Sequence, residues 1–347
     1  MLSKEDAQEF RRRLLDWFDG AQRDLPWRHT RDPYSIWISE IMLQQTRVTA
    51  AIPYYSRFLA RFPTVRALAE ASQTDVLAHW AGLGYYYRAR NMHAAAKQIG
   101  SACAFPNTYD EIRALPGIGE YTAAALASIA FDLPHAAVDG NVLRVLSRVF
   151  ADPCDTSSAA GRKHFARAAD VLLDRSRPGS FNQAMMELGA TVCLPSNPQC
   201  LLCPVSAICR ARTRGAQASF PFSSKRMKNL RESLDVFWIE RSGELLAWQR
   251  PEDSRLMPGF WELPGNEQLP EAFAVRELGR FRHGITFHDY RFRVLEAILP
   301  NELGPCRWIP ITSLGTLPAS TILRKAHRIV SRHRSKEKPA VSHAASE

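Results

Sequence analysis

Four cysteines gathered within seventeen residues constrain this 347-residue chain more than any other feature. Cys193, Cys200, Cys203 and Cys209 follow the spacing C-x6-C-x2-C-x5-C. Thiolates are the natural ligands of iron–sulfur clusters, and four of them complete a 4Fe-4S cubane. Zinc sites usually show two C-x2-C pairs, whereas this spacing contains one. The spacing therefore favours a 4Fe-4S cluster over zinc and over a chance group of buried cysteines.

The other cysteines, Cys103, Cys154 and Cys306, lie apart from this group and are expected to be buried or incidental. The total of seven is odd, and the N-terminus shows a mixed-charge amphipathic pattern instead of a signal peptide. Ser3 and Asp6 give that pattern an N-terminal capping signal, which predicts a folded helix. These features argue against a disulfide framework.

The charge balance points to a polyanionic partner. Lys and Arg number 45 against 35 Asp and Glu, which gives a net charge of +10. Such a balance favours nucleic acid or an anionic membrane. The longest apolar or small run, Ala123 to Phe131, is about half the ~20 residues that cross a bilayer. We therefore expect no membrane-spanning helix, and the charge alone does not choose between the two partners.

The predicted type of secondary structure changes once along the chain, after about residue 209. Residues 1–209 carry helical runs broken by Pro and Gly and predict an all-α part. Residues 210–232 are basic and poor in periodic apolar positions, which indicates a linker. Runs rich in β-formers then predict a smaller α/β domain over residues 233–330. Residues 331–347 are expected to form a basic disordered tail. The all-α part and the α/β domain together make the predicted fold multidomain.

A glycine-rich turn leads directly into an alanine-rich helix at Leu115–Ala123. Gly117 and Gly119 let the backbone approach a phosphate closely, and the helix N-terminus directs free N–H groups toward it. Such a hairpin can hold a DNA backbone without reading its sequence, although a plain helix-turn-helix connection also uses glycine. Asp139 follows at an expected helix start, where it serves either as an N-cap or as a functional carboxylate.

The hairpin, Asp139 and the cysteine spacing, in this order, resemble the helix-hairpin-helix base-excision glycosylases that carry a 4Fe-4S cluster. The resemblance covers residues 1–222. It implies a helical cluster domain built from residues 1–29 and 136–209. Residues 30–135 would form a six-helix domain that contains the hairpin.

Within that superfamily, the chain is similar to the adenine DNA glycosylase (MutY) family. Bifunctional members of the superfamily place a lysine nucleophile in the hairpin where this chain has Tyr121. A Schiff-base lyase route is therefore not expected. Four segments typical of adenine DNA glycosylases recur here: Leu25–Arg28 (LPWR), Trp37–Thr46 (WISEIMLQQT), Gly82–Tyr86 (GLGYY) and Phe181–Met185 (FNQAM).

Two carboxylates fit the chemistry that this resemblance implies. Cleaving the N-glycosidic bond of adenine needs an acid for the leaving group and a carboxylate for an oxocarbenium-like sugar, as in glycoside hydrolases. Apolar neighbours such as Leu43 can raise the pKa of Glu40, whereas N–H donors at a helix start keep Asp139 charged. The resemblance implies that Glu40 protonates adenine N7 and then activates water, while Asp139 stabilises or traps the cation. Tyr121 and Asn141 would support this pair.

The resemblance implies that the partner is double-stranded DNA that contains an A:8-oxoguanine or A:G mismatch, and that no membrane is a partner. A base inside a duplex cannot reach buried carboxylates, so the adenine must be flipped out and the gap filled. The resemblance implies Gln45 and Tyr85 as the wedges that fill the gap. It also implies an adenine pocket lined by Trp27, Arg28, Leu43 and Gln183.

Members of the family append a Nudix-like domain that inspects the base opposite adenine. Gly259–Pro264 and the strand pattern after Arg282 are consistent with such a domain. The acidic pair of a working Nudix box is missing, so nucleotide hydrolysis is not expected. A Phe-Ser-His loop contacts 8-oxoguanine in the family. Here Thr286 takes the serine position and Phe287 the histidine position, unless His288 substitutes, which predicts a weakened preference for 8-oxoguanine over guanine.

These inferences predict a monofunctional adenine DNA glycosylase of base excision repair, acting as an intracellular, cytoplasmic and nucleoid-associated monomer. Two alternatives stay open. A glycosylase for another mismatch, such as thymine opposite guanine, is disfavoured because Glu40 supplies the acid that purine N7 protonation needs. A non-catalytic iron–sulfur protein that binds DNA or senses redox state would keep every biochemical property after Glu40→Gln.

Overall fold

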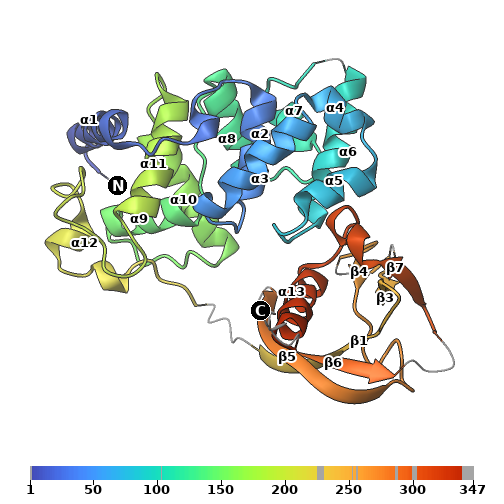
Figure 1. Ribbon diagram of the computed structural model, residues 1–347. Coiled ribbons are helices and arrows are strands. Elements are labelled where there is room, and N and C mark those ends of the chain that lie inside the picture. The colour runs from blue at the N-terminus through green and yellow to red at the C-terminus, as the bar shows by residue number, and fades with distance from the viewer. Residues whose placement is uncertain are drawn as a thin grey trace, which may run out of the picture. The chain divides into compact units, whose positions relative to one another are not determined.

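The chain is described by a computed structural model in which two compact units are distinguished. The first unit comprises Met1–Glu70 and Asn91–Arg226, and the second comprises Ala71–Arg90 and Met227–Glu347. Figure 1 shows helices throughout the blue-to-green part of the chain and strands in its orange part. The structure describes residues 2–102, 104–224, 230–251, 253–254, 257–285, 288–298 and 303–337. Cys103 and Thr286 lie outside the described residues.

Every regular element before residue 230 in the described part of the chain is helical, which confirms the predicted all-α part. The α-helices are α1 (Lys4–Ala21), α2 (Pro33–Leu43), α3 (Val48–Arg61), α4 (Val65–Glu70), α5 (Gln73–Trp80), α6 (Tyr87–Ala102), α7 (Tyr109–Ala114), α8 (Glu120–Phe131), α9 (Gly140–Phe150), α10 (Ala159–Leu172), α11 (Pro178–Thr191) and α12 (Arg210–Thr213). Two 3-10 helices, η1 (Pro26–Arg28) and η2 (Gln217–Ser219), complete this part.

The first unit has a core in which α1 packs on helices that follow much later in the sequence. Ser3 caps α1 by accepting a 3.0 Å hydrogen bond from the backbone N–H of Asp6, as predicted. Phe10 of α1 is fully buried, and its ring centroid lies 6.4 Å from that of Phe181 on α11. Burying a side chain of this size contributes about 1.5–3 kcal/mol. This core therefore fixes α11 beside the N-terminal helix.

Helices α2 and α8 pack against each other and carry two of the predicted site residues. Asp32 caps α2 by accepting from the backbone N–H groups of Tyr34 and Ser35 at 3.3 and 2.9 Å. The packed face of α8 is rich in buried alanines, which let the two helix backbones approach closely. Glu40 on α2 and Tyr121 on α8 consequently come from neighbouring helices.

The second unit contains the strands and is α/β, as predicted for the C-terminal part. One sheet has the order β1-β6-β5, in which β1 is parallel to β6 and β5 is antiparallel to it. A second sheet joins β2, β3 and β4, with β7 paired to β3. The elements are β1 (Leu230–Trp238), β2 (Glu240–Arg241), β3 (Glu244–Gln249), β4 (Trp261–Glu262), β5 (Phe273–Ile285), β6 (His288–Ile298), β7 (Cys306–Pro310), η3 (Ile311–Gly315) and α13 (Thr321–Glu337).

Successive residues of β1 contribute to two apolar clusters because strand side chains alternate between faces. Val236 packs in a cluster with residues of α13, such as Leu323. Phe237 packs in a second cluster with residues of β3 and β7, including Cys306. Cys306 is therefore buried, as expected from the sequence, while Cys154 is only partly buried.

Two boundaries differ from those drawn from the sequence. The segment after residue 209, predicted as linker, begins with ordered structure because Arg148 donates to the carbonyls of Gln217 and Phe220 at 3.1 Å each. Helix α13 continues through residues 331–337, which were assigned to the tail, and its Arg334 donates to Glu240 at 2.8 Å. Within the described residues, no helix is both long and apolar enough to cross a membrane.

Candidate active site

One cavity of about 610 Å³ in the first unit gathers most of the predicted site residues. Its wall includes residues of η1, α2, α8, α9 and α11, and thus joins segments far apart in the sequence. The predicted residues that line it are Trp27, Arg28, Glu40, Leu43, Gln45, Tyr121, Asp139, Asn141 and Gln183.

Glu40 is a buried carboxyl within this cavity wall, with 6% of its surface exposed. Burial raises its pKa from the usual 4.5 to about 7, and the nearby Asp139 adds to the rise. A hydrogen bond from the Tyr121 hydroxyl acts in the opposite direction, because it stabilises the ionised carboxylate. Glu40 is therefore about half protonated near neutral pH, as a general acid requires.

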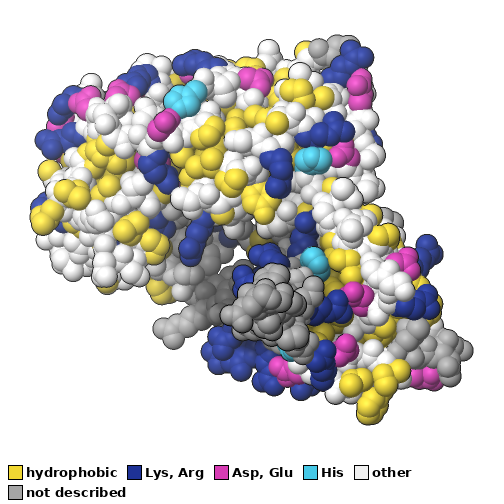
Figure 2. Space-filling model, in the orientation of Figure 1, with side chains coloured by type: hydrophobic (Ala, Val, Ile, Leu, Met, Phe, Trp, Pro, Cys, Tyr) yellow, Lys and Arg dark blue, Asp and Glu magenta, His cyan; other side chains and the backbone are white. Residues whose placement is uncertain are grey.

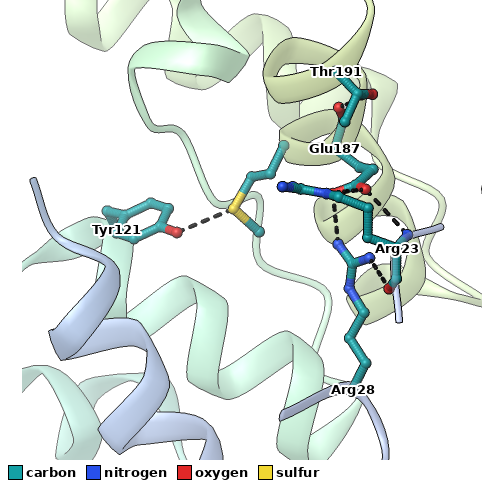
Figure 3. A network of polar contacts seen from close by, with 6 residues as sticks. Arg23, Arg28, Tyr121, Glu187 and Thr191 are labelled. Atoms are coloured by element: carbon teal, nitrogen blue, oxygen red, sulfur yellow. Dashed lines mark hydrogen bonds and ion pairs between the residues drawn. The ribbon is translucent and has the colours of Figure 1, made fainter. Parts of the chain in front are cut away.

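Tyr121 is the residue that holds the Glu40 side chain. Its hydroxyl donates to Oε2 of Glu40 at 2.8 Å. The same hydroxyl lies 3.0 Å from Sδ of Met186, a contact that Figure 3 shows as a dashed line to the sulfur. Burial and the neighbouring carboxylates raise the pKa of Tyr121 well above its usual value of 10.0. The phenol is thus a neutral hydrogen-bond donor at physiological pH.

Asp139 is the N-cap of α9, as the sequence suggested, and it also faces the cavity. Its Oδ1 accepts from the backbone N–H of Val142 at 2.7 Å, and its Oδ2 accepts from Nδ2 of Asn141 at 2.8 Å. Burial raises the pKa of Asp139, although these donors lower it. The expectation that N–H donors alone keep Asp139 charged is therefore incomplete, because desolvation outweighs them.

A chain of hydrogen bonds runs from Asp139 to the cysteine segment through α9. Arg144 donates to Oδ1 of Asn141, to the carbonyl of Gly189 and to the carbonyl of Cys193, each at 2.8 Å. A larger residue would not fit at position 189, since a Cβ added to Gly189 would lie 2.6 Å from Cβ of Asn141. The close approach of α11 to α9 therefore fixes the amide that donates to Asp139.

A second polar network in the cavity wall was not predicted from the sequence. Glu187 on α11 is 1% exposed and accepts from Nε and Nη2 of Arg23 at 2.7 Å each. Arg28 donates to Oε2 of Glu187 at 2.8 Å and to the carbonyl of Arg23 at 2.9 Å (Figure 3). Burial alone would raise the pKa of Glu187, but these arginines lower it to about 2. A glutamate among apolar residues of α11 is the only sequence signal for this network.

The two predicted wedges share an uncommon backbone conformation. Gln45 and Tyr85 have φ angles of 58° and 47°, in the left-handed region that few non-glycine residues adopt. Gln45 lines the cavity in the first unit, and Tyr85 belongs to the second unit. Arg88 supports the turn before Tyr85 by donating to the carbonyls of Leu83 and Gly84 at 3.2 and 3.3 Å. Such conformations often occur at functional sites.

The predicted hairpin is present between α7 and α8. Gly117 has a φ of 76°, and a Cβ there would lie 2.5 Å from Cβ of Asn91, so both the turn and the packing require glycine. Gly119 is the N-cap of α8 and offers no side-chain cap, so it leaves the first N–H groups of the helix without a side-chain acceptor from that position.

The four predicted cluster ligands, Cys193, Cys200, Cys203 and Cys209, line one small cavity together. Arg148 donates to Sγ of Cys193 at 3.4 Å, and Gln217 donates to Sγ of Cys200 at 3.7 Å. Such donors suit thiolate sulfurs. Among the described residues, no group of three or more potential ligands could hold a metal ion. Four thiols around one cavity are the donor set that an iron–sulfur cluster needs.

The amino-acid sequence of the chain is similar to those of known DNA repair proteins. Residues 38–167 match the family described as HhH-GPD superfamily base excision DNA repair protein. The adenine DNA glycosylase of Mus musculus is 34% identical and covers 95% of this chain and 79% of its own. The Homo sapiens adenine DNA glycosylase is 35% identical, with 93% and 74% covered. That of Buchnera aphidicola subsp. Baizongia pistaciae is 40% identical, with 58% of each chain covered.

Solved structures share the helical fold. A thermostable thymine-DNA glycosylase is 27% identical, has a TM-score of 0.55 and covers 60% of this chain and 98% of its own. A non-covalent endonuclease III–DNA complex is 22% identical, has a TM-score of 0.53 and covers 62% and 99%, which supports the fold alone. The long curated matches and the site geometry together show that the chain belongs to the adenine DNA glycosylase family.

Proposed function

We propose that this chain is a monofunctional adenine DNA glycosylase that hydrolyses the N-glycosidic bond of adenine mispaired with 8-oxoguanine or guanine. The observation that carries the proposal is a pair of carboxyls in the wall of one cavity, the buried Glu40 and the half-buried Asp139. The pKa of about 7 at Glu40 supports its role as the acid, since proton transfer is most effective near the working pH.

The proposed reaction uses the two carboxyls in turn. Glu40 donates its proton to adenine N7, and the bond between N9 and C1′ breaks as neutral adenine leaves. The ionised Asp139 stabilises the positive charge that develops at the sugar. Glu40, now a carboxylate, takes a proton from the water that attacks C1′, which restores the acid. Tyr121 orients Glu40, and Asn141 orients Asp139.

The same cavity would receive the flipped base. Trp27, Leu43 and Gln183 would line the adenine pocket together with Arg28, whose guanidinium is held by Glu187. Gln45 and Tyr85 would fill the gap left in the duplex, and the hairpin at Gly117 and Gly119 would hold the backbone. No step uses an amine nucleophile, because the hairpin position of the bifunctional enzymes is Tyr121.

The cofactor proposed for Cys193, Cys200, Cys203 and Cys209 is a 4Fe-4S cluster. When bound, the cluster would cross-link the segment between Cys193 and Cys209, and we assign it a structural role. The residues that this chain supplies for that purpose are the cysteines and Arg148, whose side chain also donates to the carbonyls of Leu194 and Pro195 at 2.6 and 3.0 Å.

The proposed organisation of the whole chain follows the succession of domains that the sequence predicted: a cluster domain (1–29 and 136–209), a hairpin domain (30–135), a linker (210–232), a Nudix-like domain (233–330) and a tail (331–347). Two of these segments are modified, since the linker begins with ordered structure and α13 extends to residue 337. The proposed enzyme acts as a monomer on nucleoid DNA.

Selectivity for 8-oxoguanine is expected to be weaker than in relatives with a Phe-Ser-His loop. Thr286 keeps a hydroxyl at the serine position, but Phe287 replaces the histidine that would bind the damaged base. The ratio of adenine release opposite 8-oxoguanine to release opposite guanine measures this effect. A ratio equal to or above that of a Phe-Ser-His relative would contradict the expectation.

The proposed activity is tested by single-turnover adenine release from duplexes that differ only in the base opposite adenine. Release is expected opposite 8-oxoguanine and guanine and not opposite cytosine or thymine. A duplex with thymine opposite guanine tests the thymine activity named for one solved relative. Thymine release without adenine release would replace the proposal, and no release from any duplex would favour a binding or sensing protein.

A further inference from the structure

The sheet β1-β6-β5 of the second unit places four arginines on one face in two cross-strand pairs. Arg280 of β5 lies directly opposite Arg293 of β6, and Arg282 lies opposite Arg291. Residues two apart on a strand share a face, so both pairs point to the same side of the sheet. We call Arg280, Arg282, Arg291 and Arg293 the arginine quartet.

Such pairing disfavours folding unless something neutralises it, because like charges directly opposite on a sheet repel. Only part of the charge is neutralised within the protein. Asp235 accepts from Arg293 at 2.5 and 2.6 Å, and Glu277 accepts from Arg280 at 2.6 and 2.7 Å. The side chains of both arginines nevertheless remain 48% and 70% exposed.

The second pair of the quartet makes no ion pair within the described part of the chain. Arg282 and Arg291 are exposed, and the structure gives neither side chain a carboxylate partner there. The neighbour of Arg291 on β1 is Ser233, which is neutral. This row therefore presents two positive charges to solvent, which an external anion would stabilise.

All four arginines line a hollow of about 1010 Å³ in the second unit. Its other wall includes Asn266, Gln268 and Arg250, and also the carboxylates Glu262 and Glu267, of which Glu262 accepts from Arg250 at 2.7 Å. Figure 2 shows Lys and Arg side chains gathered over the part of the second unit where Figure 1 places β5 and β6. The quartet is thus accessible and faces a concave polar surface.

We propose that the arginine quartet binds the phosphate backbone of duplex DNA, as a contact surface separate from the adenine cavity. The two arginine rows lie two residues apart along the strands, roughly 7 Å at ~3.4 Å per residue. This separation is close to that of neighbouring phosphates on one DNA strand. A repeated row of charge suits a polymeric anion better than a single phosphate, and guanidinium groups bind phosphate in a bidentate manner.

The inference rests on the proposed function only in taking DNA as the partner. Its test is the equilibrium binding of an undamaged duplex to the full-length protein, which needs no adenine release. The variant is Arg282→Gln/Arg291→Gln. The matched control is Arg307→Gln/Arg328→Gln, which removes the same charge from exposed arginines of β7 and α13.

The quartet variant is expected to bind the duplex about tenfold more weakly than the control at low salt. Its plot of log Kd against log salt should lose a slope of roughly 0.9 for each phosphate contact removed. Equal losses in the two variants would mean that net charge alone acts, and would overturn the proposal. Binding of free dAMP that the quartet variant abolishes, with duplex binding unchanged, would assign the hollow to mononucleotides and overturn it as well.

Thermal unfolding without DNA separates binding from a structural role. Removing the repulsion between Arg282 and Arg291 is expected to leave the melting temperature unchanged or to raise it. The control should behave like the wild type. A lower melting temperature for the quartet variant would show that these arginines hold the sheet together, and would contradict the proposal.

Discussion

At the scale of single residues, the candidate site depends on how burial changes the protonation of two carboxyls. Glu40 and Asp139 both lose solvation in the cavity wall, but they have different hydrogen-bond partners. Glu40 accepts from a single phenol, whereas Asp139 accepts from a backbone N–H and from an amide. The donors at Asp139 oppose the effect of burial on its pKa more than the single phenol does at Glu40, so the ionised form is better supported at Asp139 than at Glu40.

The pKa of Glu40 makes stability depend on pH in a defined direction. Because it rises from 4.5 to about 7 on folding, the native state loses stability as the pH increases through that window. Glu40→Gln removes the free-energy cost of ionising a buried carboxyl. Above pH 7 the substitution should therefore raise the free energy of unfolding by up to about 3 kcal/mol. Below pH 4.5 it should have little effect. Denaturant unfolding at several pH values checks this, and a pH-independent difference would contradict it.

Tyr121→Phe is expected to move the pH dependence of adenine release upward. Without the phenol donor, the ionised form of Glu40 is less stable, so its pKa rises further and the acid stays protonated at higher pH. The rate at the optimum should fall because Glu40 is less well oriented. A pH–rate profile measures both effects, with Tyr54→Phe as the control. A lower rate with an unshifted profile would argue against this hydrogen bond.

The sequence identified the carboxyl pair because each residue sits in a recognisable segment. It did not identify Glu187, since the arginines that lower its pKa come from a segment more than 150 residues earlier. Long-range ion pairs of this kind leave no local pattern. The backbone conformation of Gln45 and Tyr85 could not be predicted from the sequence either. A positive φ is expected at glycine, and neither residue is a glycine.

At the scale of elements, α9 links the candidate site to the cysteine segment. Its N-cap is Asp139, and one turn later Arg144 binds Asn141, Gly189 and Cys193. A further turn along, Arg148 is fully buried and donates to carbonyls of the cysteine segment. The helix therefore holds both the carboxylate and the loop that would surround the cluster.

Arg144→Met is expected to slow adenine release by roughly tenfold, the loss associated with a hydrogen bond to a charged group. Asn141 would lose the contact that orients its amide, which weakens the hydrogen bond that this amide donates to Asp139. Single-turnover rates and duplex affinity should be measured together, since affinity is expected to change little. Arg167→Met, at an exposed position of α10, is the matched control. Equal rates in the two variants would exclude a role for α9 in positioning Asp139.

The boundaries of elements were less predictable than their type. The capping signal of α1 is local, and the structure confirms it. The order of the segment around Gln217 depends on Arg148, which no local pattern connects to it. Helix α13 continues past residue 330, where Arg334 donates to Glu240, a residue far away in the sequence.

At the scale of the whole molecule, the sequence predicted a helical part followed by an α/β part, and the structure confirms both. Periodicity and turn residues are local signals that can be recognised in the sequence without knowledge of packing. The division into units was less predictable, because Ala71–Arg90 groups with the strands although its sequence is helical. Such grouping depends on tertiary contacts. The net charge of +10 agrees with the two DNA contacts that we propose, the hairpin and the arginine quartet.

The central claim is that Glu40 supplies the proton that releases adenine. The most direct test is the single-turnover rate of adenine release from a duplex with adenine opposite 8-oxoguanine. The wild-type chain is compared with Glu40→Gln and with Glu70→Gln, an exposed glutamate of α4. We expect release by the wild type and by Glu70→Gln, and a loss of at least about a hundredfold in Glu40→Gln. Release by Glu40→Gln at the wild-type rate would contradict the account.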